Sequence, residues 1–475
     1  MRPPGVLAPF SSVRSGNAAT RGTCQPGLGG RVLRTRDVLR VAPLRAPGTE
    51  VQGVNSESLL RSLYGRSAVR PLAVGGVTAL LGTLLSCGYG SGYSIQTVSV
   101  PNSIAVADVN GDGVPDLLVA TTSYQGNPTN PGFANVILDN KTTAGTFQKG
   151  VPYPTTGTNP SSIAVADLTR SGSLDLVIAN YASGSVSVFM HGSTPGSYMP
   201  AVTVTTGGLP NQVVIADVNL DGHPDLVLAD ASASGNAIVL LQDPANPGQF
   251  LAPALLSTGS TSAPSVAVAD LNGDGKPDVV AATSDASGNN GAVYVFYQSA
   301  TSPGTFLAAR VFPAGAQPQA VRTADVNGDG LPDLVVANFG PGADGTGSAG
   351  VSVLLQDAAN PGSFLAPVTY ASQARAMDVA VGDLNGDGKP DLVVANLGPA
   401  PTGSVSVLLQ DAAQPGVFLS ATSYAGFGQP LSVTIADLNG DGHPDIAVAD
   451  STSATIMLQN ATAPGTFAAA TQVGN

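Results

Sequence analysis

The chain has 475 residues, of which 58 are Gly and 37 are Pro; Trp is absent and only 11% of residues are charged. This turn-rich, weakly charged composition favours an all-β fold over a helical one. The formal net charge of −13 is unevenly spread, because residues 71–475 contain 8 basic residues and 29 acids, all of them Asp. Such acidity argues against nucleic-acid binding, which requires a basic surface.

The first 87 residues differ from the rest. Residues 1–58 are rich in Arg, Pro and Gly without sustained periodicity, which is typical of disorder. Residues 59–87 place three Arg before an apolar run from Pro71 to Leu85, which is the pattern of an export signal. The run is shorter than the roughly 20 residues that span a bilayer, so a membrane anchor or a core segment is the less favoured alternative.

The apolar run ends in Leu84-Leu85-Ser86-Cys87, which resembles a bacterial lipobox and makes Cys87 the candidate lipidation site. Residues 88–93 predict a flexible tether. Because a signal belongs at the start of a chain, we expect translation to begin near Val51 to Leu60. The predicted location is the bacterial cell envelope or surface, with the chain tethered to a membrane by lipid, or otherwise secretion.

One nine-residue pattern organises residues 94–475. The stretch Asp108-Val-Asn-Gly-Asp-Gly-Val-Pro-Asp116 returns 50 to 59 residues apart, in copies that begin at Asp167, Asp217, Asp270, Asp325, Asp383 and Asp437. A short aliphatic run precedes and follows each copy. A regular period of this size indicates a repeat architecture.

The pattern has the chemistry of a calcium loop. Side-chain oxygens at positions 1, 3, 5 and 9, with the backbone carbonyl of position 7, can converge on a hard cation that accepts six to eight oxygens. Gly at position 6 permits a positive φ, and Pro at position 8 restricts the backbone. An EF-hand is excluded, because position 12 is aliphatic rather than Glu and the flanks are predicted strands. A solvated turn is the alternative for any one copy, but seven regularly spaced copies favour metal.

Six loops carry the complete predicted ligand set for calcium. By loop, the ligands are Asp108, Asn110, Asp112, Val114 and Asp116; Asp217, Asn219, Asp221, His223 and Asp225; Asp270, Asn272, Asp274, Lys276 and Asp278; Asp325, Asn327, Asp329, Leu331 and Asp333; Asp383, Asn385, Asp387, Lys389 and Asp391; and Asp437, Asn439, Asp441, His443 and Asp445.

The second copy departs from the pattern. Thr169 replaces Asn, Arg170 replaces Gly and Ser171 replaces the central Asp, so only Asp167 and Asp175 remain as carboxylates. Because calcium affinity follows ligand charge, we expect this seventh site to be weak or empty. Arg170 is expected to lie across the loop and offset the two carboxylates.

Each repeat contains four predicted strands. The first enters the loop, as in Ser265–Ala269, and the second leaves it, as in Asp278–Ala282. The third is an alternating run such as Val293–Phe296, and a Gly-x-aromatic turn such as Gly304-Thr-Phe306 precedes the fourth, as in Leu365–Tyr370. Four antiparallel strands in each of seven repeats predict a seven-bladed β-propeller.

These residues resemble the FG-GAP or VCBS repeats, which include the propeller of integrin α subunits. The resemblance covers residues 94–475 and is most specific in the Asp-x-Asn-Gly-Asp-Gly-x-Pro-Asp loops. It implies seven blades, calcium in the hairpin between the first two strands of each blade, and extracellular adhesion or binding. The family's Phe-Gly pair is reduced here to the Gly-x-aromatic turn, so the resemblance does not name a partner.

Two classes of function follow. We expect a monomeric, non-catalytic module that binds protein or glycan, because the three histidines form no catalytic constellation and the repeated Asp residues are assigned to metal. The alternative is a lyase or hydrolase acting on polysaccharide. Its acids would have to come from outside the loops, from a set that includes Asp230, Asp344, Asp378 and Asp450.

Two more predictions concern the ring itself. Arg322 stands where other repeats have a small residue, and an ion pair with Asp378 is favoured over a ligand contact in the central channel. The ring end opposite the metal loops is the predicted ligand face, with ordinary loop variation as the alternative. Its candidate residues are Asn180, Tyr181, Gln317, Gln319, Asn338, Phe339, Asn396 and Gln429.

Overall fold

The computed structural model describes residues 100–122, 131–260, 262–284, 290–340, 349–373, 375–398 and 402–473. The predicted extension, signal and tether lie outside these residues, and so do Cys87, the expected translation start and Asp344.

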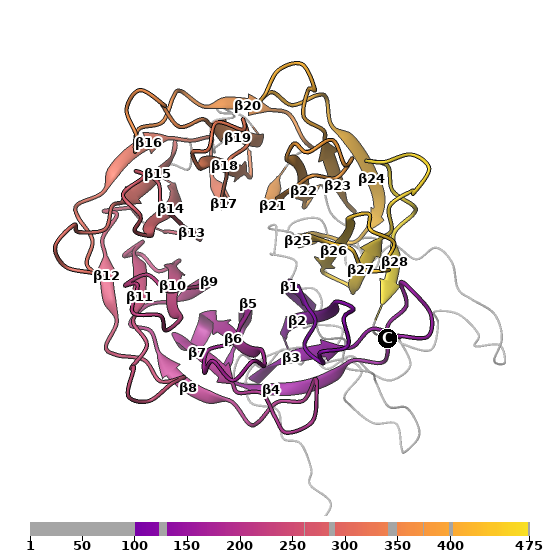
Figure 1. The fold of residues 1–475 in the computed structure, drawn as a ribbon, viewed down its shortest axis with the longest axis horizontal. Helices are drawn as coiled ribbons and strands as arrows, with labels where there is room; N and C mark the ends of the chain where they lie inside the picture. Colours follow the sequence, from indigo (N-terminus) through magenta and orange to yellow (C-terminus); the bar gives the residue numbers. More distant parts are fainter. Residues whose placement is uncertain are drawn as a thin grey trace, which may run out of the picture. The chain divides into compact units, whose positions relative to one another are not determined.

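The described residues form seven four-stranded antiparallel sheets arranged as a ring (Figure 1). We number these sheets as blades 1 to 7 in chain order. Within each blade four consecutive strands lie side by side in sequence order, from the centre of the ring to its rim. The predicted all-β, seven-bladed propeller is therefore confirmed. No strand is exchanged between blade 1 and blade 7 in the described part of the chain.

The strand bounds follow the four-part pattern of the repeats. The first strands are β1 (Val100–Ala107), β5 (Pro160–Ala166), β9 (Pro210–Ala216), β13 (Ser265–Ala269), β17 (Pro318–Ala324), β21 (Ala376–Gly382) and β25 (Pro430–Ala436). The second strands are β2 (Asp116–Thr122), β6 (Asp175–Asn180), β10 (Asp225–Asp230), β14 (Asp278–Ser284), β18 (Asp333–Asn338), β22 (Asp391–Asn396) and β26 (Asp445–Asp450).

The outer half of each blade contains the other two strands. The third strands are β3 (Pro131–Ile137), β7 (Ser185–Phe189), β11 (Ala237–Leu240), β15 (Gly291–Phe296), β19 (Gly350–Leu354), β23 (Gly403–Leu408) and β27 (Ala454–Met457). The fourth are β4 (Val151–Thr158), β8 (Val202–Thr205), β12 (Ala254–Leu256), β16 (Arg310–Pro313), β20 (Val368–Tyr370), β24 (Thr422–Phe427) and β28 (Thr471–Val473). A short 3-10 turn, η2 (Tyr181–Ser183), follows β6.

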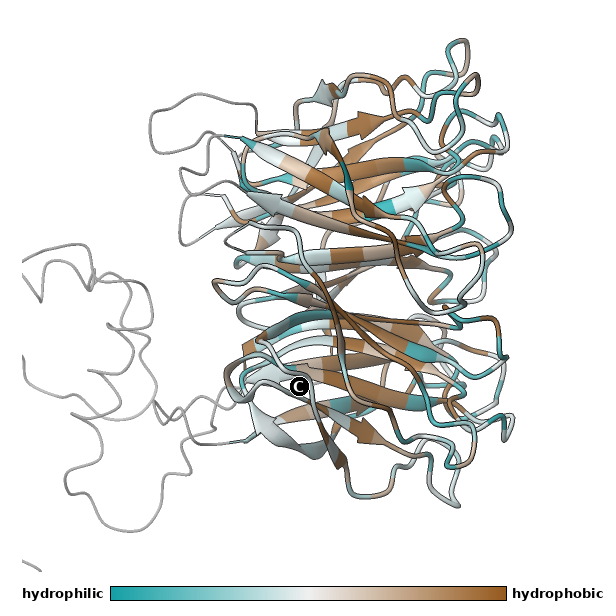
Figure 2. Ribbon diagram, turned by 90° about the vertical axis from the view of Figure 1, so that its left-hand side faces the viewer, coloured by the Kyte–Doolittle hydropathy of each residue, from teal (hydrophilic) through white to brown (hydrophobic). Residues whose placement is uncertain are grey.

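Burial changes from the centre of the ring to its rim. The second strands are buried almost throughout, which explains their near-continuous aliphatic sequence, since a neighbouring blade covers each face. The fourth strands are mostly exposed. Figure 2 shows hydrophobic residues along the strands and hydrophilic residues in the loops at their ends.

The hydrophobic core is divided into seven clusters, one between each pair of neighbouring blades. The cluster that closes the ring packs Ile104 and Leu117 of blade 1 against Leu438 and Ile456 of blade 7. Each blade therefore gains its hydrophobic stabilisation from both neighbours rather than from a core of its own.

The predicted strand bounds are least accurate in the fourth strand. In blade 5 the strand was expected over Leu365–Tyr370 but begins at Val368. The reason is that Phe364 forms an isolated bridge with Gln356, and the chain leaves regular pairing for the next three residues.

Candidate metal centres and central channel

Each loop between the first and second strand of a blade closes around the carboxylate at position 1. In blade 1, Asp108 Oδ1 accepts the N–H groups of Gly111 and Asp112 at 2.7 and 3.1 Å, and Oδ2 accepts that of Gly113 at 2.8 Å. The two glycines have φ values of 74° and 91°. The positive φ expected at position 6 is present, and position 4 requires one as well.

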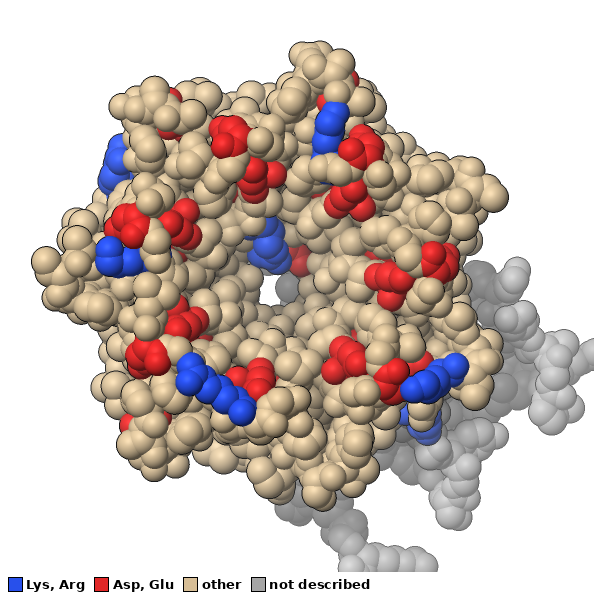
Figure 3. Space-filling view, viewed as in Figure 1, with Lys and Arg blue, Asp and Glu red and all other residues tan. Residues whose placement is uncertain are grey.

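The oxygens of positions 1 and 3 share one backbone donor. The N–H of Asp112 donates to Asp108 Oδ1 at 3.1 Å and to Asn110 Oδ1 at 2.9 Å. Asp112 Oδ1 in turn accepts the N–H of Val114 at 3.0 Å. Blades 3 to 7 repeat all three bonds. Backbone N–H groups therefore hold the oxygen ligands of positions 1, 3 and 5 within one small loop. Figure 3 shows acidic clusters around the face of the ring on which these loops lie.

The carboxylate at position 9 is buried and joins the loop to the blade. Asp116 Oδ2 accepts the N–H of Val109 at 3.0 Å, and Oδ1 accepts that of Asp139, which follows the third strand, at 2.8 Å. The other six blades make the same two bonds. Burial raises the pKa of Asp116 to about 6 although both bonds lower it. Position 9, predicted only as a ligand, thus has a structural role as well.

The donor set is made of oxygen alone, which fits a hard cation such as calcium better than zinc. Among the described residues, no three Asp, Glu, His or Cys side chains are already grouped as a metal would hold them. The carboxylates accept backbone N–H groups of their own loops and, at position 9, also one N–H from beyond the third strand. The loops therefore fit calcium in composition and position, and binding would require these side chains to turn toward the ion.

The loop of blade 2 has the same fold with fewer donors. Asp167 accepts the N–H groups of Ser171 and Gly172 at 2.9 and 2.7 Å. Arg170, at position 4, adopts a φ of 59°. Among the described residues no ion pair joins Arg170 to Asp167 or Asp175. The prediction that its side chain lies across its own loop is therefore wrong. Its guanidinium lies over Gly222 in the loop of blade 3, where a Cβ would be 2.0 Å from Nη2.

A recurrent amide that sequence reasoning missed connects each of five loops to its blade. In these blades a Gln lies two residues after the third strand; the residues are Gln242, Gln298, Gln356, Gln410 and Gln459. Its Nε2 donates to the carbonyl of the Pro at position 8 at 2.6–2.9 Å. Its Oε1 accepts the N–H of the Gly-x-aromatic turn at 3.0–3.3 Å. In the sequence, this Gln could have been found by its constant position six residues before the Gly of the turn.

The Gly-x-aromatic turn of each blade packs against the preceding blade. Gly196 of blade 2 has a φ of 71°, and a Cβ there would lie 3.4 Å from Cβ of Asn110 and 3.0 Å from Leu138 of blade 1. Its N–H donates to the carbonyl of Val109 at 3.1 Å. The glycine thus meets both a backbone and a packing requirement. Because Asn110 is a proposed ligand, the metal loop of one blade forms part of its interface with the next.

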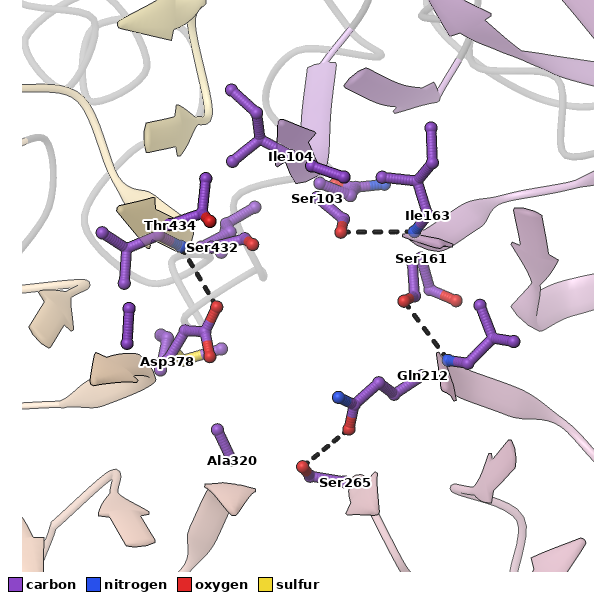
Figure 4. A pocket seen from close by; sticks show the side chains of 18 of the residues that line it. Ser103, Ile104, Ser161, Ile163, Gln212, Ser265, Ala320, Asp378, Ser432 and Thr434 are labelled. Carbon is purple, nitrogen blue, oxygen red and sulfur yellow. Dashed lines mark hydrogen bonds between the residues drawn. The ribbon is translucent and has the colours of Figure 1, made fainter. Parts of the chain in front are cut away.

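The first strands surround a central cavity of about 770 Å³ to which all seven blades contribute (Figure 4). At five of the interfaces between blades, the side chain five residues before the first Asp of the loop accepts an N–H from the first strand of the next blade. The acceptors are Ser103, Ser162, Gln212, Ser265 and Asp378, at distances of 2.9–3.3 Å. These bonds align adjacent blades at the channel.

Blade 5 has Ala320 at the equivalent position and therefore offers no side-chain acceptor to blade 6. Here Arg322 Nη2 forms an ion pair with Asp378 Oδ1 at 2.5 Å. The same oxygen accepts the N–H of Val379, and Asp378 Oδ2 accepts that of Val433. The predicted ion pair is present, and it compensates for the missing contact between two blades.

The predicted ligand face is only partly available. Asn180, Asn338 and Asn396 are fully buried, and each donates from Nδ2 to a serine of the neighbouring third strand. Their prediction as ligand residues is wrong, because they satisfy buried polar groups at the end of the second strand. The half-buried residues that remain are Tyr181, Gln317, Gln319, Phe339 and Gln429. The guanidinium of Arg375 lies 5.5 Å from the centre of the Phe339 ring.

Three of the acids outside the loops are buried and hydrogen-bonded. Asp230 accepts the N–H groups of Leu209 and Ser232, both at 2.9 Å. Asp450 accepts the N–H of Thr452 at 2.7 Å and the hydroxyl of Thr455 at 3.2 Å. These acids stabilise loop ends, as Asp378 stabilises the channel.

Comparison with protein-family models identifies FG-GAP repeats over most of the propeller. The model described as an FG-GAP-like repeat matches residues 108–178, 170–228, 217–281, 270–336 and 395–448. The model described as an FG-GAP repeat matches residues 318–355 and 376–408. No curated protein matches the chain.

Two solved structures are reported among those similar to this chain. One, a protein of Bacteroides uniformis to which 6-phosphogluconolactonase activity is attributed, has a TM-score of 0.51 and 15% identity, covering 75% of this chain and 97% of its own. The other, an Agrocybe aegerita lectin specific for non-reducing terminal N-acetylglucosamine, has a TM-score of 0.45 and 19% identity, covering 75% and 87%. No helix within the described ranges is long and apolar enough to cross a membrane.

Proposed function

Because the chain belongs to the family of FG-GAP repeat proteins, we propose that it is an exported, non-catalytic binding module whose propeller is stabilised by calcium. The observation that carries the proposal is the identical arrangement of oxygen donors in six loops on one face of the ring. An arrangement repeated in six loops is better suited to stabilising each blade than to catalysing one reaction at one site.

Calcium would supply the positive charge that three clustered carboxylates lack in each of the six complete loops. The side chains of positions 1, 3, 5 and 9 and the carbonyl of position 7 would hold it. Each of these six loops also contacts the Gly-x-aromatic turn of the next blade through its Asn at position 3. Ordering the loops would therefore stabilise the interfaces between blades as well as the loops themselves.

The ligand-binding surface is proposed at the ring end opposite the metal loops. There the guanidinium of the exposed Arg375 lies over the ring of the half-buried Phe339. The amides of Gln317, Gln319 and Gln429 add hydrogen-bonding groups at the same end of the ring. A planar aromatic surface with amides suits a protein loop or a sugar ring, so the proposed ligand is protein or glycan.

The alternative function, a polysaccharide lyase or hydrolase, is less well supported. Asp230, Asp378 and Asp450 are each at most 5% exposed and accept structural hydrogen bonds. Acids that stabilise the fold in this way are poorly placed to transfer protons to a bound polymer.

The two functions can be separated with one set of proteins. We expect full-length protein to bind members of a glycan array or a surface protein panel without cleaving any polysaccharide. Phe339→Ala with Arg375→Ala should lower that binding, whereas Leu220→Ala on the loop face should not. Polysaccharide cleavage that survives purification, or binding that ignores the Phe339 and Arg375 changes, contradicts the proposal.

Export is proposed to end in lipidation at Cys87. Cys87→Ser should release the protein from the membrane fraction or block its maturation, since several acyl chains give firm anchoring. Mass spectrometry of the mature protein provides the check. A mature chain that retains Arg2 to Arg45 refutes both the lipobox and the expected translation start.

A further inference from the structure

Blade 1 differs from the other blades at the second residue after its third strand. Five blades have Gln there, blade 2 has His191, and blade 1 has Asp139. Gln donates to the carbonyl at position 8 of its loop and accepts from the Gly-x-aromatic turn, so both ends of the amide are used. Aspartate is shorter by one methylene and, when ionised, can only accept.

The Asp139 side chain is buried without a complete set of partners. The residue is 4% exposed, and its Oδ1 has no hydrogen-bond partner. Burying an ionised carboxylate without compensation is costly, and nothing comparable occurs at the Gln positions. The unused oxygen of this buried carboxylate is therefore available to a partner from outside the chain.

The surroundings of Asp139 identify the kind of partner. Its backbone N–H donates to Asp116 Oδ1 at 2.8 Å, which places it beside position 9 of the metal loop. Asn110 Nδ2, at position 3, donates to the same Asp116 oxygen at 3.4 Å, and Lys141, two residues after Asp139, reaches Asp112 at position 5. The unused oxygen of Asp139 therefore lies next to a loop that already holds carboxylate and amide oxygens, the ligand types that calcium prefers.

We propose that the carboxylate of Asp139 is an additional ligand for the cation in the loop of blade 1, which makes this the tightest of the metal sites. The inference rests on the proposed calcium binding and adds to it a ligand from outside the nine-residue loop. Blade 1 then offers four carboxylates, Asp108, Asp112, Asp116 and Asp139, where the other complete loops offer three.

The nearby positive charge does not replace the cation. Lys141 Nζ lies 4.0 Å from Asp112 Oδ2 and donates to the Asp112 carbonyl at 3.1 Å. Its side chain is 64% exposed, so this ion pair is weak and readily exchanged. Lys141 makes no ion pair with Asp139 within the described part of the chain, and the inner oxygen of Asp139 stays without a partner.

Calcium titration of the full-length, calcium-free protein by calorimetry tests the inference. Wild type should show one tight site and five weaker ones. Asp139→Gln, which installs the residue of five other blades, should weaken the tight site by about tenfold while all six sites remain, because affinity follows ligand charge. Asp112→Asn should weaken or remove the same site. Asp139→Asn serves as a second variant of unchanged shape.

A thermal melt distinguishes a ligand from a structural residue. Asp139→Gln should raise the melting temperature in chelator, since an unpaired buried charge is removed, and reduce the shift that calcium produces. If the tight site is lost with Asp112→Asn but unchanged by Asp139→Gln and Asp139→Asn, Asp139 is not a ligand, while the proposal of calcium binding stands. A proton shared between Asp139 and Asp112 would give this result. Absence of calcium binding in wild type overturns both proposals.

Discussion

The loop of blade 2 and the six complete loops have the same fold but not the same donors. In blade 2, Asp167 still accepts the N–H groups of positions 5 and 6, and Asp175 still accepts that of position 2. The loop keeps this shape although Asn, Gly, Asp and Pro are all replaced at positions 3, 4, 5 and 8.

This comparison separates two tasks within nine residues. Positions 1 and 9 fix the wrap by accepting backbone N–H groups, so they are needed with or without metal. The wrap survives in blade 2 without the amide of position 3 and with only the Ser171 hydroxyl at position 5, which accepts the N–H of Ser173 at 3.3 Å. The amide and the carboxylate of these positions are therefore available to a cation. A loop without the amide of position 3 and the carboxylate of position 5 therefore still forms the hairpin.

The largest expected effect is that of removing calcium altogether. At a Kd of ~0.1 mM, ~1 mM calcium stabilises the fold by about 1.4 kcal/mol per site, or roughly 8 kcal/mol for six sites. For a propeller of this size chelation should lower the melting temperature by about 10 °C. Scanning calorimetry with and without chelator is the measurement, with magnesium as the control ion. Identical melting curves contradict calcium stabilisation.

The next effect separates position 9 from position 5 within one loop. Asp333→Ala removes the acceptor of two buried N–H groups and should cost about 2–5 kcal/mol in chelator, and more in calcium because a ligand is lost as well. Asp329→Asn keeps the acceptor for Leu331 and should cost about 1.4 kcal/mol, only when calcium is present. Denaturant unfolding in both conditions distinguishes them. An equal loss for both variants in chelator shows that the two tasks are not separate.

Restoring the donors of blade 2 should create a seventh site. Thr169→Asn with Ser171→Asp adds a carboxylate and an amide to a loop already folded around Asp167. The gain in stability should be about 1.4 kcal/mol in calcium and absent in chelator. Calorimetric titration should count one more ion than in wild type. No added ion would show that Arg170 or the missing Pro, rather than the donor count, disables this loop.

The smallest effect concerns the backbone alone. Leu220 stands at position 4 of blade 3 with a φ of 59°, where most blades have Gly. Leu220→Gly should stabilise the fold by up to about 1 kcal/mol, equally with and without calcium, because a left-handed conformation is strained for a residue with Cβ. Leu220→Ala is the matched control and should gain nothing. A gain that depends on calcium would assign Leu220 to the metal site instead.

The fold was predictable from the sequence because every repeat carries the same local signals. Alternating aliphatic runs, Asp-rich loops and Gly-x-aromatic turns recur seven times, so errors at one repeat are corrected by the others. The ion pair of Arg322 with Asp378 was predictable for the same reason, since a charged residue stood out against its six counterparts.

The site was less predictable, because burial depends on the neighbouring blades. Asn180, Asn338 and Asn396 look like surface amides in the sequence, yet the ring buries them at strand ends. The sequence likewise could not show that Asp116 and its counterparts are buried. The orientation of the Arg170 side chain depends on how close the loop of the next blade lies. The local sequence pattern does not contain that distance.

The most direct test of the account is a crystal structure of the full-length protein grown with calcium, with ions identified by anomalous scattering. We predict calcium in the loops of blades 1, 3, 4, 5, 6 and 7, with Asp139 as an added ligand in blade 1, and none between Asp167 and Asp175 in blade 2. Full calcium occupancy in blade 2 at the same distances as in the other loops, or no calcium in any loop, would contradict it.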